Sequence, residues 1–364
     1  MSTDGAFPVS VDSMAQAAQV RKAIWLDDLR SVRIVRFGLG VALAMAIAFG
    51  FNWPLQFLLP VLTASLLGSK QPAPTLREGF NNILSIVAAF GLGLTFSLFA
   101  LVYPLVYVPA LGLVLFHIYY LVNRGGAAFF AIMLLIAVLL LPMMAQQADL
   151  LADGIATGFI GFGALAVGVQ WLAHAILPDP LDTRPSAKRP GGLRPGYSAA
   201  AAHNAVKSML VVLPVATLFI AAHWSSQALV IIFVAIYSVA PVLRVSKQDT
   251  LYKFLANVLG GCAALVFYWL LVAVPEYYFL IALSLVSALL FGSVMFSDKP
   301  TAPYYSSAFS TLLVLISTSM GEGADFGANF WIRVGLVAIA GLYVVGALSV
   351  LEHVWPPPDP TTRS

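Results

Sequence analysis

The polar residues with the clearest chemical potential form a short motif that occurs twice. Ser69-Lys70-Gln71 recurs as Ser246-Lys247-Gln248, and an asparagine follows each copy at the same spacing from a Thr-Leu pair. Ammonium and amide groups are suitable donors for a carboxylate. We therefore predict a symmetric vestibule that attracts anions, formed by Lys70, Gln71, Asn82, Lys247, Gln248 and Asn257. In the alternative interpretation, the lysines only anchor the chain at the membrane face and the asparagines only pack between helices.

Arg333 is the one cation at the opposite end of the predicted membrane spans. It follows the stretch GEGADFGANFWI, about one turn inside the last span. A guanidinium group can hold a carboxylate through two parallel hydrogen bonds, so we predict that Arg333 binds an anion before its release. Alternatively, its side chain reaches the lipid headgroups or forms an ion pair with Asp325 or Glu322.

Coupling to a proton gradient would need titratable groups near the membrane. By position, the candidates are Asp149, Asp153, His117 and Asp325. The alternative is that each is an ordinary loop acid or a packed residue.

Several kinds of chemistry have no motif in the chain. There is no phosphate-binding Gly-x-x-x-x-Gly-Lys sequence. There is also no His-Glu-x-x-His, and Cys262 is the only cysteine. The five histidines are scattered. We therefore predict no catalytic residue, no metal site and no cofactor, and the protein is not expected to be an enzyme.

The composition identifies lipid as the solvent for most of the chain. Of the 364 residues, 60% are hydrophobic and 10% are charged, and the mean hydropathy is +0.91. A soluble domain has about 25% charged residues. The 19 Lys and Arg residues exceed the 16 Asp and Glu residues by only three and are dispersed, which argues against binding nucleic acid.

Apolar runs separated by Pro, Gly, Asn and charged residues predict about twelve transmembrane helices in an all-α polytopic protein. They start near Arg33, Pro54, Phe80, Tyr103, Ala127 and Gly154 in the first half, and near Ala201, Gln227, Thr250, Tyr277, Pro303 and Asn329 in the second. The run from Pro54 is short and contains Pro60, so it could be bent or only partly spanning. If the N-terminus is cytoplasmic, every inner loop has Lys or Arg and no outer loop does, which predicts two cytoplasmic termini.

The chain also repeats itself as a whole. LAHAILPDPLDTR, from Leu172 to Arg184, returns as LEHVWPPPDPTTR at the end of the chain, and further polar motifs recur in the same order. This pattern predicts two parallel six-helix repeats related by an axis along the membrane normal. The expected divisions are a tail over 1–30, a first repeat over 31–180, a linker over 181–198, a second repeat over 199–356 and a tail over 357–364. Val11 to Leu29 is compatible with a helix on the membrane surface or with a partly ordered tail.

The first half, from FNWPLQFLLPVLTASLLGSKQPAPTLREGFNN through VQWLAHAILPDP, resembles the fusaric acid resistance and aromatic acid exporter family of bacterial inner-membrane proteins. It looks like the shorter members, which lack the soluble domain. The resemblance implies a multi-pass inner-membrane exporter of small organic anions such as aromatic carboxylic acids. It also implies lipid, a periplasmic adaptor protein and an outer-membrane channel as partners, and it leaves a homo-oligomer open.

Other functions remain open on the sequence alone. Distant similarity to plant anion channels keeps a channel mechanism in consideration. A membrane scaffold or enzyme of cell-envelope assembly is the alternative from a different class. The major facilitator class also has twelve spans, but the loop SKQPAPTLREGFNN lacks its Gly/Asp/Arg-rich signature.

Overall fold

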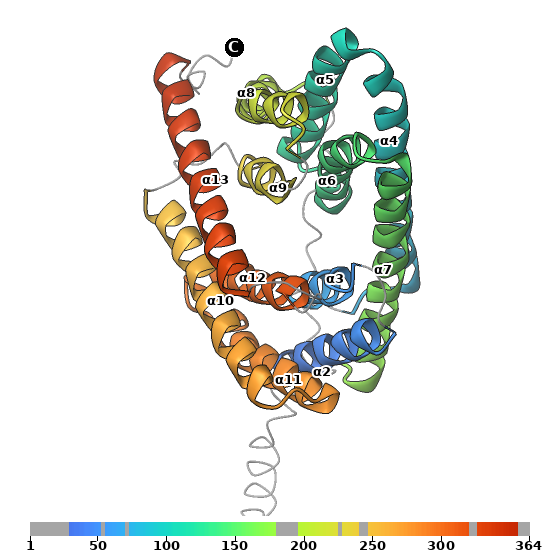
Figure 1. Cartoon of the computed structure of the whole chain (residues 1–364), viewed down its shortest axis with the longest axis vertical. Helices are drawn as coiled ribbons and strands as arrows, with labels where there is room; N and C mark the ends of the chain where they lie inside the picture. Colours follow the sequence, from blue (N-terminus) through green and yellow to red (C-terminus); the bar gives the residue numbers. More distant parts are fainter. Residues whose placement is uncertain are drawn as a thin grey trace, which may run out of the picture.

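The computed structural model describes residues 29–51, 55–69, 73–179, 196–224, 228–239, 247–319 and 326–355, which form an all-α structure (Figure 1). The first half contains α2 (Leu29–Gly50), α3 (Leu58–Leu67), α4 (Leu76–Val102), α5 (Pro104–Asn123), α6 (Ala128–Ala145) and α7 (Asp149–Ile176). The second half contains α8 (Ala199–Ala221), α9 (Ala228–Tyr237), α10 (Lys247–Ala273), α11 (Tyr277–Met295), α12 (Ala302–Ser319) and α13 (Phe326–Val354). Each of these twelve helices begins close to a predicted start, so all twelve are confirmed as helices, and eight of them qualify as membrane spans. The predicted surface helix from Val11 and the tail over 357–364 lie outside the described residues.

The helices differ in whether they can cross a bilayer. Eight of those described are long and apolar enough: α2, α4, α5, α6, α7, α8, α10 and α11. The chain is therefore a multi-pass membrane protein by helix length and hydropathy. By contrast, α3 and α9 have 10 residues each. Such a helix is about 15 Å long, half of the roughly 30 Å hydrocarbon core. The sequence raised partial spanning for α3, because of Pro60, but gave no such sign for α9.

The two halves pair their helices in the same order. We call α2–α7 the first set and α8–α13 the second set. In the first set, α7 contacts α2, α3, α4 and α6, while α4 and α6 contact each other and α5, and α2 contacts α3. Each of these pairings recurs between the helices at corresponding positions of the second set.

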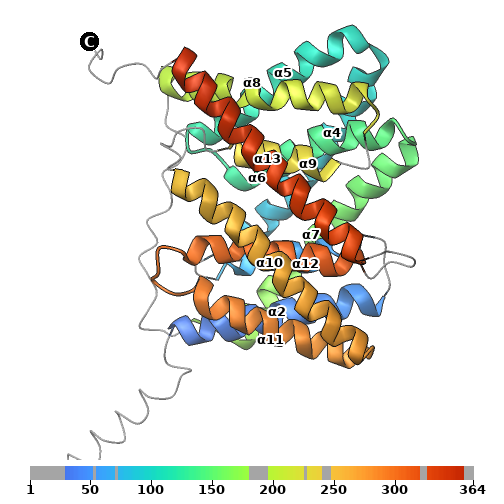
Figure 2. The same ribbon diagram turned by 60° about the vertical axis from the view of Figure 1, so that its left-hand side comes forward.

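The two most extensive pairings between the sets are antiparallel: α2 with α11, and α5 with α8. The pairs α6 with α9, α3 with α12 and α6 with α8 also make contact. Both views place α2 beside α11 at one end of the molecule and α5 near α8 at the other (Figures 1 and 2). At the start of α2, Arg30 Nη2 donates a hydrogen bond of 2.7 Å to the Ser293 carbonyl, near the end of α11. Near the end of α2, Tyr277 Oη donates one of 2.6 Å to the Ala46 carbonyl.

The α5–α8 pairing is secured by tyrosines near the end of α5. The backbone N–H of Ser198, before α8, donates to Tyr120 Oη at 3.2 Å. The neighbouring Tyr119 is fully buried, and its hydroxyl donates to the Ala235 carbonyl, near the end of α9, at 3.0 Å. Polar groups inside a membrane bundle must find partners in the protein, and these hydroxyl groups find theirs in the opposite set.

Some glycines allow helices to approach closely, which small residues commonly do between membrane helices. A Cβ atom added at Gly260 of α10 would collide with the backbone carbonyl oxygen of Ala308 on α12. Gly93 of α4 similarly faces Ala137 of α6, the corresponding pair in the first set. Gly161 of α7 has no atom within 4 Å of an added Cβ, so not every helical glycine serves packing.

We expect Gly260→Ala to lower the thermal unfolding midpoint of the detergent-solubilised protein. The new methyl group must push α10 and α12 apart, an overpacking that costs about 1–3 kcal/mol. Gly161→Ala is the matched control, because it adds the same methyl group in open space and gains up to about 1 kcal/mol of helix propensity. Equal midpoints for the two variants would show that the α10–α12 contact is not tight.

Candidate functional site

The structure locates the predicted vestibule residues only in part. Lys70 and Gln71 lie outside the described residues. Lys247 and Gln248 begin α10, but their side chains are not among those described. Asn82 on α4 is half-buried. Asn257 on α10 is buried, and its Oδ1 accepts a 2.6 Å hydrogen bond from the Thr311 hydroxyl on α12.

These contacts bear on the two interpretations of the asparagines. Asn257 links α10 to α12, which is the helix-packing role. Asn82 lies on α4, whose main partner is α6. The described residues therefore provide no contact between the two asparagines, and the vestibule stays a prediction.

The other predicted residues are also dispersed. Arg333 belongs to α13, but its side chain is not among those described, and Asp325 lies outside the described residues. His117 is exposed on α5, with Nδ1 2.7 Å from the Leu113 carbonyl. Asp149 and Asp153 are exposed in the first two turns of α7, and a carboxylate is favourable at a helix start. The structure does not bring His117 and these aspartates together.

The most buried ion pair among the described residues joins the first and last helices of the first set. Arg36 on α2 lies 2.8 Å from Asp179, which follows α7, and the two side chains are 5% and 11% exposed. Arg36 Nη1 also donates to the Leu177 carbonyl at 3.1 Å. A buried charge in a membrane helix is costly unless it is paired or faces a cavity. Because each charge needs the other, the pair holds the beginning of the first set against its end.

Two side chains of α7 extend this ion pair into a larger site. We call Arg33, Arg36, Gln170, His174 and Asp179 the polar cluster. Gln170 and His174 are one turn apart, and both are at least nine-tenths buried. His174 has electrostatic interactions with Arg36, Asp179 and Arg33. Among the described residues, the cluster therefore combines two guanidinium groups, one carboxylate and a titratable imidazole.

The hydrogen bonds of His174 fix the role of each ring nitrogen. His174 Nδ1 lies 2.8 Å from the Gln170 carbonyl oxygen, which can only accept, so Nδ1 carries the proton of the neutral ring. His174 Nε2 is then an acceptor, and it is buried without a partner among the residues that the structure describes. Gln170 Oε1 is a second buried acceptor without one. Unpartnered buried acceptors are unusual, so this site suits a group that brings a hydrogen-bond donor.

The polar cluster lies where the half-length helix α3 ends. Gln170 Nε2 donates to the Leu66 carbonyl in the last turn of α3, at 3.4 Å. Leu67 fills the space beside Gly40, one turn beyond Arg36 on α2. The first vestibule motif, Ser69-Lys70-Gln71, follows directly. Sequence reasoning missed Arg36 and His174, although the repeated Leu-x-His and Pro-Asp-Pro motifs contain two members of the cluster.

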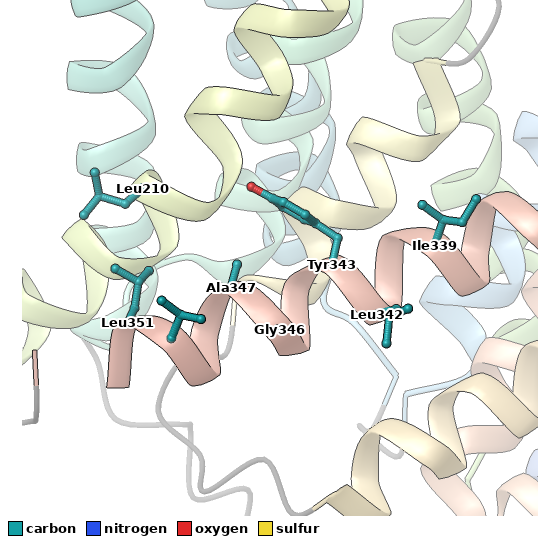
Figure 3. A pocket seen from close by; sticks show the side chains of 8 residues that line it. Leu210, Ile339, Leu342, Tyr343, Gly346, Ala347 and Leu351 are labelled. Atoms are coloured by element: carbon teal, nitrogen blue, oxygen red, sulfur yellow. The ribbon is translucent and has the colours of Figure 1, made fainter. Parts of the chain in front are cut away.

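A second feature is an open apolar groove between α8 and α13. It has a volume of about 550 Å³, and its lining is aliphatic except for Tyr343 (Figure 3). The Tyr343 hydroxyl already donates to the Val211 carbonyl at 2.9 Å. The lining has no charged group, so the groove suits a hydrocarbon chain rather than a carboxylate.

Residues 33–172 match a family described as "Protein of unknown function (DUF2955)". The match runs from α2 to the last turns of α7, and therefore corresponds to the first set. It gives no support specific to the fusaric acid resistance family. No curated protein and no solved structure matches the chain.

We expect the replacement Arg36→Met to destabilise the protein by about 3–5 kcal/mol, because it leaves Asp179 buried without a partner. The double variant Arg36→Met, Asp179→Leu should recover most of this loss, because neither charge remains. Thermal unfolding in detergent measures both effects, and Arg77→Met, at an exposed arginine of α4, is the control. Additive losses in the double variant would mean that the two side chains do not act as a pair.

Proposed function

We propose that this protein is a permease of the bacterial inner membrane that exports small organic anions, chiefly aromatic carboxylic acids. The observation that carries the proposal is the polar cluster at the end of the half-length helix α3. Fixed guanidinium groups give a carboxylate the positive charge and the hydrogen-bond donors that the hydrocarbon core of the membrane lacks. An acid in its protonated form also brings the O–H donor that Gln170 Oε1 and His174 Nε2 lack.

The proposal includes an internal duplication. The corresponding helix pairings of the two sets support it, as do the repeated polar motifs. The antiparallel pairings of α2 with α11 and α5 with α8 agree with twelve segments of alternating direction. On this basis we place a pseudo-twofold axis along the membrane normal and both termini in the cytoplasm. The first and second repeats are 31–180 and 199–356.

Short helices at matching positions point to the substrate path. In transporters with internal repeats, interrupted membrane segments in corresponding positions indicate the binding site. Here α3 and α9 are both second in their sets and both have 10 residues. Each follows a connection with a non-glycine residue at positive φ, Leu55 at 60° and His223 at 54°. Such backbone strain is often concentrated at functional sites.

His174 is the best candidate to handle a proton in this permease, in place of the exposed His117, Asp149 and Asp153. Proton uptake at Nε2 turns this acceptor into a donor, which can compete with Arg36 for the Asp179 carboxylate. The Arg36 guanidinium then becomes available to an anion. The proposed partners of the permease are a periplasmic adaptor and an outer-membrane channel, as the family resemblance implies.

Transport by inverted membrane vesicles tests the proposal. We expect uptake of radiolabelled hydroxybenzoate that increases with an imposed pH gradient. His174→Gln should lower this uptake about tenfold, the effect of losing about 1.4 kcal/mol, and should remove the gradient dependence. His117→Gln is the matched control, since it removes an exposed histidine. Flux that ignores the gradient would favour a channel, and no flux in wild-type vesicles would favour a scaffold or enzyme.

The same vesicles test the anion contacts predicted from the sequence. At equal membrane abundance, we expect the double variant Lys70→Ala, Lys247→Ala to lower the initial rate, because it removes the positive charge that attracts anions. Arg333→Gln should lower the rate more than Arg333→Lys, which keeps the charge. Wild-type rates in all of these variants would leave the three cations as membrane anchors.

A further inference from the structure

We infer that the polar cluster holds one buried water molecule between Gln170 Oε1 and His174 Nε2, and that Gln170 thereby positions the proton donor of His174. The proton-relay part of this inference rests on the role of His174 in the proposed function, whereas the water site does not depend on transport. A carboxylic acid bound at the cluster brings an O–H to the same acceptors, so the water belongs to the protein without substrate.

Two acceptors on one face of α7 define the site. Gln170 is 6% exposed and His174 is 9% exposed, and residues four positions apart on a helix are neighbours on its surface. Gln170 Oε1 and His174 Nε2 are both buried without a hydrogen-bond partner among the described residues. A buried acceptor without a partner is unfavourable inside a membrane protein, so a molecule that donates to both atoms removes two penalties.

The other polar atoms of these two side chains are already engaged. His174 Nδ1 lies 2.8 Å from the Gln170 carbonyl oxygen, and Gln170 Nε2 lies 3.4 Å from the Leu66 carbonyl oxygen. A carbonyl oxygen can only accept, so the amide nitrogen of Gln170 must face Leu66 and its Oε1 must face away. Neither side chain can therefore donate to the other without giving up a contact that it already has.

Charged groups reach His174 from α2 and from the segment after α7. α7 packs against α2, α3, α4 and α6, and the charges that interact electrostatically with His174 are those of Arg36, Asp179 and Arg33. The sequences of α3 and α6 contain no titratable residue. The other titratable residues of α7 are in its first two turns, at the opposite end of the helix. The charged residues of α4 are exposed in its first turn: Arg77 and Glu78.

This charge balance selects water over a cation. With a neutral His174 ring, the two guanidinium groups outweigh the one carboxylate, and the excess positive charge disfavours an ammonium or metal ion. Guanidinium groups only donate hydrogen bonds, so they attract the oxygen of a water molecule and turn its two O–H bonds away. Those two donors match the two acceptors, and buried waters commonly bridge polar groups that otherwise have no partner.

The bridging water is also the point at which a proton can reach His174. Nδ1 already carries a proton and is bound to the backbone, so uptake must occur at Nε2. A proton can pass to a side chain through one water molecule. When a proton arrives on the water oxygen, the O–H bond that points at Nε2 breaks and an N–H bond forms. The water is restored and the ring becomes an imidazolium. Gln170 does not touch the transferred proton, and its role is to position the water.

Solid-state NMR of the full chain in lipid bilayers tests the site, with histidine labelled by the magnetic nitrogen isotope. The signal of His174 is the one that disappears in His174→Gln. At a pH where the ring is neutral, we expect magnetisation to pass from water protons to Nε2 and not to Nδ1. Gln170→Met should lower this transfer about fivefold, because losing a hydrogen bond of about 1 kcal/mol weakens the hold on water by that factor.

Two further variants separate the water from the anchoring of α3. Ser69→Ala is the matched control, since it removes the other side-chain hydrogen bond to the Leu66 carbonyl, 3.0 Å long, and leaves the polar cluster intact. Gln170→Glu keeps an acceptor on a side chain of the same length. We expect wild-type transfer in both. An equal loss in Ser69→Ala and Gln170→Met would show that the end of α3, not a bridging water, controls access to Nε2.

The proton relay has its own readout in the same spectra. We expect exchange between the neutral and protonated signals of His174 to slow about fivefold in Gln170→Met, by the same loss of about 1 kcal/mol, and to recover in Gln170→Glu. Absence of water transfer to Nε2 in the wild type, or unchanged transfer in Gln170→Met, overturns the inference. None of these measurements uses transport. A protein that exports anions without water at Nε2 would refute only the inference, and one with this water but no export would refute only the proposed function.

Discussion

The pairing of α2 with α11 and of α5 with α8 is the constraint on which the rest of the fold depends. In lipid, helices associate through close packing and hydrogen bonds rather than through a hydrophobic driving force. Each set therefore needs surfaces that only the other set offers. The buried face of α5, which includes Tyr119, packs with α8 and α9 in one core. The fourth helix of each set, α5 or α11, finds its most extensive packing surface on the first helix of the other set. The two sets therefore form one body.

The polar cluster adds a second kind of bond to this packing. Arg36 and Asp179 connect the beginning of the first set to its end, while Gln170 holds the last turn of α3. The half-length helix is thus positioned by a polar contact at one end and by apolar packing along its sides. In the proposed permease, a change of charge at His174 would act on both the ion pair and α3, because all three meet at the same place.

Sequence reasoning located the helices well because apolar runs and their Pro, Gly and Asn boundaries are local signals. It failed on the Arg36–Asp179 pair, which joins residues 143 positions apart in the chain. A single arginine inside an apolar run does not reveal its partner. The repeated Pro-Asp-Pro motif was visible, but its role depends on the contact of α7 with α2. Likewise, the hydrogen bond of Asn257 exists only because α10 packs on α12, which no spacing along the chain encodes.

The α2–α11 pairing also shapes how the chain is made. Roughly 250 residues separate these helices, so a ribosome working at about 5–20 residues per second supplies α11 on the order of ten to fifty seconds after α2. During this interval α2 and its arginines are in the membrane, but α11, the helix with which α2 makes its most extensive contact, is not yet made. Synthesis of α7 brings Asp179 to Arg36 well before α11 exists. The nascent first set can therefore form the Arg36–Asp179 ion pair early. The face of α2 that packs on α11 stays uncovered until the second set is synthesised.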